Sequence, residues 1–331
     1  MLVIVAPGQG AQTPGFLAPW LADESCAAYL NWLSAVAGLD LAEAGTNADA
    51  EAIRDTSVAQ PLLVASGLCA ARSLFLPDQN GQTDAPPERT ITPPAQAILA
   101  GHSVGELTAA ALAGVLSAEQ AMVLVRERGR QMARAASATP TSMTAILGGD
   151  PETVKDAVEA VGLTLANHNG AGQLVAAGTT EQLATLAANP PARARLAPLR
   201  VAGAFHTAHM RPAVAHLENL AQAVSARDPK TRLLTNADGR LIGSGQVCLA
   251  NLVSQVANPV RWDLCLATMR RLGATGLLEL PPAGTLAAIA KRNLPGVEIF
   301  TLNTPNQLAD ARAFVARHVD ADQTDGFEAA A

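Results

Sequence analysis

Residues 97–110, AILAGHSVGELTAA, place one serine between two glycines and decide how the fold is interpreted. An apolar run precedes the serine, and an alanine-rich segment with helical character follows from about Gly105. Gly101, Ser103 and Gly105 fit the pattern G-x-S-x-G, in which a sharp strand-to-helix turn exposes a nucleophilic serine. The pattern also arises by chance, and a serine before a helix is commonly only its cap. The flanking strand and helix favour the nucleophile.

A nucleophilic Ser103 needs a general base, and the chain has six histidines. His206 lies in GAFHTAHM, residues 203–210, where a loop enters a helix that we expect over about 206–226. Such junctions lie at sheet edges, where active sites form. A metal site built on His206, His209 and His216 lacks a carboxylate to complete a ligand set. We therefore interpret His206 as the candidate base and predict no metal.

Arg128 is the least expected residue of a helix predicted over about 118–136. It is the only charge on an apolar stripe made of Ala121, Leu124, Val125, Met132 and Ala135. A buried arginine needs a partner, because an unpaired buried charge is costly. That partner is either an Asp or Glu elsewhere in the fold or the free carboxylate of a substrate, held in bidentate fashion.

Composition restricts the class of protein. The chain has 331 residues, 49% of them hydrophobic, and a net charge of −6, which argues against a general nucleic-acid binder. Its four cysteines form no C-x-x-C pair and are typical of a reduced protein. The N-terminus lacks a basic region before its apolar run, and no apolar run approaches the roughly 20 residues of a membrane span. We expect a cytoplasmic protein that binds neither nucleic acid nor membrane.

The order of predicted elements indicates an inserted subdomain. Residues 140–202 read as strand-helix-strand-strand-helix-strand, which is the ferredoxin-like order. Strands alternate with helices on both sides of this insertion, so 1–139 and 203–318 are expected to share one α/β sheet. Residues 2–7, 97–101, 231–236, 276–281 and 297–303 are its predicted strands, with a helix at 284–293 between the last two. Residues 77–96 are predicted to be an exposed loop, and 319–331 a disordered tail.

Six motifs along the chain resemble those of the malonyl-CoA:acyl carrier protein transacylases, in that family's order and spacing. They are PGQGAQ (7–12), GHSVGE (101–106), RERGRQM (126–132), NHNGAGQLVAAG (167–178), GAFHTAHM (203–210) and QVANPVRW (255–262). The resemblance spans nearly the whole chain. It implies an α/β-hydrolase-like large subdomain with a parallel sheet and a ferredoxin-like small subdomain.

The resemblance also implies a catalytic dyad. Ser103 would be the acylated nucleophile and His206 its general base. Gln255 would orient His206 through its backbone carbonyl, in place of the usual acidic third residue.

The remaining site residues follow from the same resemblance. The backbone N–H groups of Gln9 and Val104 would form the oxyanion hole, and Arg128 would bind the malonyl carboxylate. Asn169 and Gln173 would line the cleft between the subdomains, although turn residues of the small subdomain explain them equally well.

The implied reaction moves a malonyl group from malonyl-CoA to the phosphopantetheine thiol of an acidic acyl carrier protein, through a malonyl-serine. The CoA thioester is then a substrate, no cofactor is permanently bound, and the protein is expected to be a monomer. Phe205 before the histidine resembles the malonyl-type signature of related acyltransferases. Candidate residues for a basic rim that meets the carrier protein are Arg193, Arg195, Arg200, Lys291 and Arg292.

One segment departs from the family pattern, and several functions stay open. Pro281-Pro282-Ala283-Gly284 stands where the family usually has a Gly-Pro-Gly turn.

An esterase or thioesterase would use the same elbow with water as acceptor, but it has no carboxylate for Arg128 to hold. A non-catalytic family member would not need the intact Ser103, His206 and Arg128 set. Fatty-acid synthesis, polyketide synthesis and malonate decarboxylation are not separated by the sequence.

Overall fold

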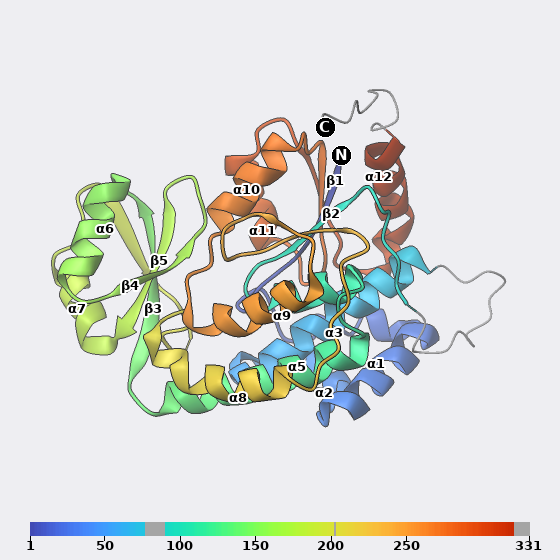
Figure 1. Ribbon diagram of the computed structural model, residues 1–331, viewed down its shortest axis with the longest axis horizontal. Coiled ribbons are helices and arrows are strands. Elements are labelled where there is room, and N and C mark those ends of the chain that lie inside the picture. Colours follow the sequence, from blue (N-terminus) through green and yellow to red (C-terminus); the bar gives the residue numbers. More distant parts are fainter. Residues whose placement is uncertain (77–89, 202, 321–331) are drawn as a thin grey trace.

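The computed structural model describes residues 1–76, 90–201 and 203–320, and its centre is a six-stranded sheet (Figure 1). The strands lie in the order β10-β9-β1-β2-β7-β8, and all adjacent pairs are parallel except β7 and β8. Their bounds are β1 (Leu2–Ala6), β2 (Ile98–Gly101), β7 (Arg232–Leu234), β8 (Leu241–Ile242), β9 (Gly276–Glu279) and β10 (Glu298–Thr301). The predicted α/β class with a parallel sheet is confirmed.

Alternation along the buried strands gives the sheet two cores. Leu2, Ile4 and Leu99 belong to one apolar cluster, while Val3 and Val5 belong to the other. The helices on the first side are α1 (Glu24–Ala37), α2 (Leu41–Thr46), α3 (Thr56–Phe75), α4 (Gly105–Leu112), α5 (Ala118–Ser137), α9 (Gly245–Ser254) and α12 (Leu308–Asp320). Helices α10 (Trp262–Arg271) and α11 (Thr285–Asn293) cover the second side.

Helix α3 corrects one expectation from the sequence. Its 20 residues are long and apolar enough to cross a membrane by length and composition, although no such run was expected. In the fold, 83% of its most apolar window is buried inside the protein. The apolar surface of α3 is therefore used in the core, where it packs against α5, α1 and α4.

The second sheet takes all its strands from one continuous segment. Its elements are β3 (Thr141–Gly148), α6 (Pro151–Ala160), β4 (Thr164–His168), β5 (Gln173–Thr179), α7 (Thr180–Ala188) and β6 (Ala194–Pro198). The antiparallel order β4-β5-β3-β6 is ferredoxin-like. Helices α6 and α7 cover one face, and the other face packs toward the body of the protein through residues such as Met143 and Val175 (Figure 1).

The segment after the small sheet is less helical than its pattern indicates. In place of one helix over 206–226, a 3-10 turn at Ala208–Met210 leads into the shorter α8 (Arg211–Ala221). His206 has a left-handed backbone with φ of 62°, which no helix contains. The helix can begin only after this residue, and Pro212 in its first turn suits that start.

Helices α9, α10 and α12 were not predicted, and α12 corrects the proposed tail. Residues 319 and 320 belong to α12, whereas 321–331 and most of the predicted 77–96 loop lie outside the described residues. Shorter 3-10 turns lie at Trp20–Ala22, Ala52–Arg54, Gln255–Ala257 and Pro305–Gln307.

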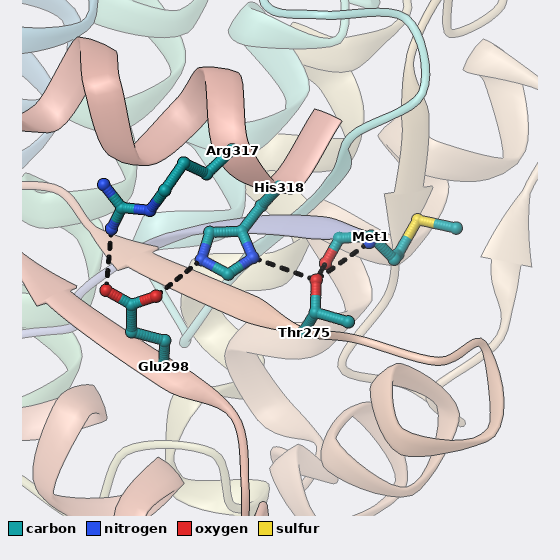
Figure 2. A network of polar contacts seen from close by, with 5 residues as sticks. All are labelled: Met1, Thr275, Glu298, Arg317 and His318. Carbon is teal, nitrogen blue, oxygen red and sulfur yellow. Dashed lines mark hydrogen bonds and ion pairs between the residues drawn. The ribbon is translucent and has the colours of Figure 1, made fainter. Parts of the chain in front are cut away.

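Helix α12 docks on the sheet through a buried histidine (Figure 2). One ring nitrogen of His318 lies 2.9 Å from Thr275 Oγ1, and the other lies 3.1 Å from a carboxylate oxygen of Glu298. Arg317 donates to the same carboxylate, and the Met1 amino group donates to Thr275. The amino end of β1, the start of β9 and the last described helix are thus joined.

Candidate active site

The turn after β2 has the strained geometry of a nucleophile elbow. Ser103 has φ of 54°, a conformation that costs on the order of 1–3 kcal/mol for a residue other than glycine. A Cβ on Gly105 would overlap the carbonyl of Ala6, and a Cβ on Gly101 would overlap the backbone of Gly105. Both glycines are therefore required for strand β1, strand β2 and helix α4 to approach one another here.

Ser103 meets His206 across 103 residues of sequence. Ser103 Oγ lies 2.7 Å from His206 Nε2, and His206 Nδ1 lies 2.8 Å from the backbone oxygen of Gln255. The carbonyl can only accept, so Nδ1 carries the proton and Nε2 is the acceptor for the serine hydroxyl. Burial, and then the charge of Arg128, lowers the pKa of His206 to about 3. The ring is neutral near pH 7 and able to take a proton.

Arg128 lies beside the serine with neutral partners. Its guanidinium donates to Gln60 Oε1 at 2.7 Å, to Gln255 Oε1 at 3.0 Å and to Ser103 Oγ at 3.3 Å. Only 3% of the residue is exposed, and burial lowers its pKa to about 10 against the opposing charge of Glu106. Within residues 1–76, 90–201 and 203–320, no carboxylate forms an ion pair with it. Arg128 is thus a buried cation beside the nucleophile.

Glu106, Gln255 and Asn236 form a polar layer behind the arginine. The Glu106 carboxylate accepts from the side-chain amide of Gln255 and from the backbone N–H of Asn236. Burial raises the pKa of Glu106 to about 8, which weakens it as a counter-ion for Arg128. Gln60, Glu106 and Asn236 were not predicted from the sequence. Glu106 carries a local signal, an acid in the apolar helix after the elbow, but the others are far from the motif.

Two backbone amides are available at the mouth of the elbow. In the described part of the chain, neither the Gln9 nor the Val104 N–H has a hydrogen-bond acceptor. Residues Gly8, Gln9 and Gly10 follow β1, and they line the same cavity as Ser103. The Gln9 side chain is tied back to the backbone oxygen of Arg54 at 3.2 Å. The turn after β1 therefore offers its backbone, more than its side chain, to the cavity.

A cavity of about 240 Å³ opens over the serine between the two sheets. The large subdomain contributes Ser103 and His206, and the small one contributes residues that include Asn169 and Gln173. Asn169 Oδ1 lies 3.0 Å from His102 Nε2, while the side chain of Gln173 accepts from Arg292 at 2.8 Å. Both predicted cleft residues thus line the cavity, and each bonds to the opposite subdomain.

The 281–284 loop, which departs from the family pattern, leads directly into α11. The peptide between Pro281 and Pro282 is cis. The buried carboxylate of Glu279 accepts backbone N–H groups of Gly284, Leu286 and Ala287 at 2.8–2.9 Å. This carboxylate caps α11, whose first residues line the cavity.

The other histidines considered as metal ligands lie elsewhere. His216 pairs with Glu127 between α8 and α5, at 3.3 Å. Over the part of the chain that the structure describes, no three His, Cys, Asp or Glu residues gather in a way that could hold a metal ion.

Comparison with known proteins identifies relatives of this chain. A model of the acyl transferase domain matches residues 3–301. A malonyl CoA-acyl carrier protein transacylase of Mycobacterium bovis is 45% identical over 308 residues, covering 93% of this chain and 98% of the relative. The protein of the same name from Escherichia coli K12 is 30% identical over 318 residues, covering 93% and 97%.

Solved structures agree with the sequence relatives. The crystal structure of MCAT from Mycobacterium tuberculosis superposes with a TM-score of 0.86 at 44% identity, covering 94% of this chain and 99% of the other. A malonyl-transacylase solved in complex with a type II polyketide synthase acyl-carrier protein gives a TM-score of 0.83 at 29% identity, with 94% and 99% covered.

Proposed function

This chain belongs to the acyl transferase domain family, among the malonyl-CoA:acyl carrier protein transacylases, and from that premise we propose how its site moves a malonyl group from malonyl-CoA to an acyl carrier protein. The alignments with the family relatives cover almost all of this chain and almost all of each relative. The transfer serves fatty-acid or polyketide synthesis, since one solved relative is bound to a polyketide carrier protein.

In the first half of the reaction Ser103 attacks the thioester carbonyl of malonyl-CoA. His206 Nε2 takes the hydroxyl proton as the oxygen–carbon bond forms, and it returns that proton to the CoA sulfur as the carbon–sulfur bond breaks. The 2.7 Å contact between the two side chains supports direct transfer. In the second half the phosphopantetheine thiol of the carrier protein attacks the malonyl-serine. His206 takes the thiol proton and returns it to Ser103 Oγ as the bond between the serine oxygen and the malonyl carbon breaks.

Backbone groups stabilise the two charges that develop during the reaction, the oxyanion and the imidazolium. The free N–H groups of Gln9 and Val104 stabilise the tetrahedral oxyanion, an effect of about 3–4 kcal/mol for each donor. The carbonyl of Gln255 stabilises the imidazolium that forms when His206 takes the proton. A backbone oxygen here does the work of the acid in a Ser-His-Asp triad.

Arg128 beside Ser103 is the observation that carries the proposal. Its buried guanidinium has amide oxygens for partners, and these can give way to a carboxylate, which is a stronger acceptor. The 3.3 Å contact with Ser103 Oγ puts the cation at the distance of a short acyl chain from the reacting carbonyl. A hydrolase acting on simple esters would have no group to place there.

We propose the boundaries 1–139 with 203–318 for the large subdomain and 140–202 for the small one, because the second sheet uses only residues 141–198. We propose a monomeric, cytoplasmic enzyme without a permanent cofactor. An acidic carrier protein would approach the cavity mouth near Arg292, which already bonds to Gln173 there.

Intact-protein mass spectrometry after mixing with malonyl-CoA tests the reaction. We expect a malonyl adduct that is absent in Ser103→Ala and that passes to holo acyl carrier protein. Loss of the adduct only to water would favour a thioesterase instead. An adduct that persists in Ser103→Ala would show that another residue is acylated.

A further inference from the structure

Asn236 lies fully buried two residues after the end of β7, the strand next to β2. Its side-chain oxygen accepts the backbone N–H of Ser103 at 2.8 Å, and its side-chain nitrogen donates to the backbone oxygen of Gly101 at 2.8 Å. Its own backbone N–H donates to Glu106 at 2.7 Å. One side chain therefore bonds to the elbow backbone on both sides of His102.

These two bonds fix the part of the turn that is strained. Ser103 lies beyond the last residue pair of the β1–β2 ladder, Ala6 and Gly101, so its partly buried N–H needs an acceptor outside the ladder. Asn236 Oδ1 supplies that acceptor, so the Ser103 amide is occupied and the amide of Val104 remains the free donor at the elbow. The amide orientation is unambiguous, because one partner is a donor and the other an acceptor.

The same side chain also reaches the residue behind the base. Gln255 Nε2 donates to Asn236 Oδ1 at 3.4 Å, while the backbone oxygen of Gln255 holds His206. Asn236 touches neither the cavity nor the reacting atoms among the described contacts. Its bonds end on the nucleophile's backbone and on the residue that orients the base.

We propose that Asn236 is a positioning residue that holds Ser103 at attacking distance from His206 and leaves the Val104 amide free for the oxyanion. The proposal rests on the proposed acyl transfer for its kinetic readout. Small displacements of reacting groups cost on the order of 100-fold in rate. The effect should fall on the chemical step and leave substrate binding nearly unchanged.

Asn236→Ala tests this role, with Asn251→Ala as the matched control. Asn251 donates to Thr235, the residue before Asn236, but has no bond to the elbow. We expect single-turnover malonylation of Ser103 to fall about 100-fold in Asn236→Ala, with the KM for malonyl-CoA within about threefold of wild type. Asn251→Ala should keep the wild-type rate. A normal acylation rate in a folded Asn236→Ala protein would overturn the proposal.

Asn236→Asp is a conservative second variant with its own signature. When protonated, its carboxyl group accepts from the Ser103 N–H and donates to the Gly101 oxygen, as the amide does. We expect its acylation rate relative to wild type to rise as the pH falls from 8 to 5.5, because protonation of the carboxyl group restores the donor to the Gly101 oxygen. Glu106, Arg128, Cys265 and His206 are the titratable groups around the site and are present in both proteins. A constant ratio would contradict the proposal, as would failure of both variants to fold while Asn251→Ala folds.

A serine-directed fluorophosphonate probe separates this proposal from the proposed function. The probe reports the reactivity of Ser103 without malonyl-CoA. If wild type reacts with the probe but is not malonylated, the proposed function fails. If Asn236→Ala then labels as fast as wild type, the positioning role fails as well. Slow labelling of Asn236→Ala supports the positioning role in either case.

Discussion

Arg128 is the side chain that we expect to select malonyl-CoA over acetyl-CoA. Arg128→Ala should lower the ratio of kcat/KM for malonyl-CoA to that for acetyl-CoA about 10- to 150-fold, because one charge-assisted contact is worth about 1.5–3 kcal/mol. Steady-state kinetics with both substrates measures the ratio. Arg130→Ala is the control, since Arg130 lies on the same helix and pairs with Glu127 on the surface. An unchanged ratio would remove Arg128 from substrate selection.

The lowered pKa of His206 gives a prediction about pH. A base with a pKa of about 3 is unprotonated throughout pH 5–7, so kcat/KM for malonyl-CoA should be constant over that range. The rate with an ordinary histidine as base would fall about 16-fold between pH 6.5 and pH 5 if it followed the usual pKa of 6.5. Stopped-flow acylation in constant-ionic-strength buffers measures the profile. A fall centred near pH 6.5 would show that His206 is not shifted in this way.

The residues that the sequence revealed are those with a local pattern. Ser103 stands between glycines, His206 lies within the motif GAFHTAHM, and Arg128 interrupts an apolar stripe. The structure brings these three together at hydrogen-bond distances. Gln60 and Asn236 could not be found in this way, because their partners lie 68 and 133 residues distant and their own surroundings are ordinary.

The packing of the elbow between β2 and α4 against β1 is predicted to require glycine at position 105. Gly105→Ala should destabilise the protein by about 1–3 kcal/mol and greatly reduce acylation, since the new methyl group would overlap the Ala6 carbonyl and push α4 away from β1. Thermal unfolding and acylation rates measure the two effects. Gly243→Ala is the control, because a Cβ there meets nothing within 4 Å. Wild-type stability for Gly105→Ala would mean that the close approach is not required.

Elements with strong local signals were predicted well, and those set by context were not. The predicted helices at 118–136 and 284–293 match α5 and α11 to within one residue at each end. The helix expected over 206–226 was wrong at its start, because the contacts of His206 impose a backbone that no pattern of polarity reveals. Helices α9, α10 and α12 lie in stretches for which no helix was proposed.

The contacts that dock α12 on the sheet are predicted to stabilise the whole molecule against unfolding. His318→Ala should lower the free energy of unfolding by about 2 kcal/mol, because it removes the contacts to Thr275 and Glu298 (Figure 2) and the tilted ring contact with Phe314. The acylation rate should not change, since none of these residues lines the cavity. Chemical denaturation and acylation kinetics measure both. His209→Ala is a control outside this network, and equal stability of the two variants would contradict the role of the docking.

The division of the chain into two sheets was predictable because the two sheets differ in the spacing of their strands and helices along the sequence. Residues 140–202 repeat short strands and helices, while the larger sheet alternates strands with longer segments. The strand order was not predictable, since β1 lies between β2 and β9 only through the contacts of the finished fold. The cavity between the sheets was likewise visible in the sequence only through the family resemblance.

The position of β1 at the centre of the sheet also determines when the chain can fold during its synthesis. Met1 and Thr275, which join β1 to β9, are 274 residues apart, so this contact becomes available on the order of 15–55 s after β1 leaves the ribosome. The small sheet needs only residues 141–198 and can form earlier. The apolar strand β1 therefore lacks one of its two neighbours for most of the synthesis, while every strand of the small sheet has already been made.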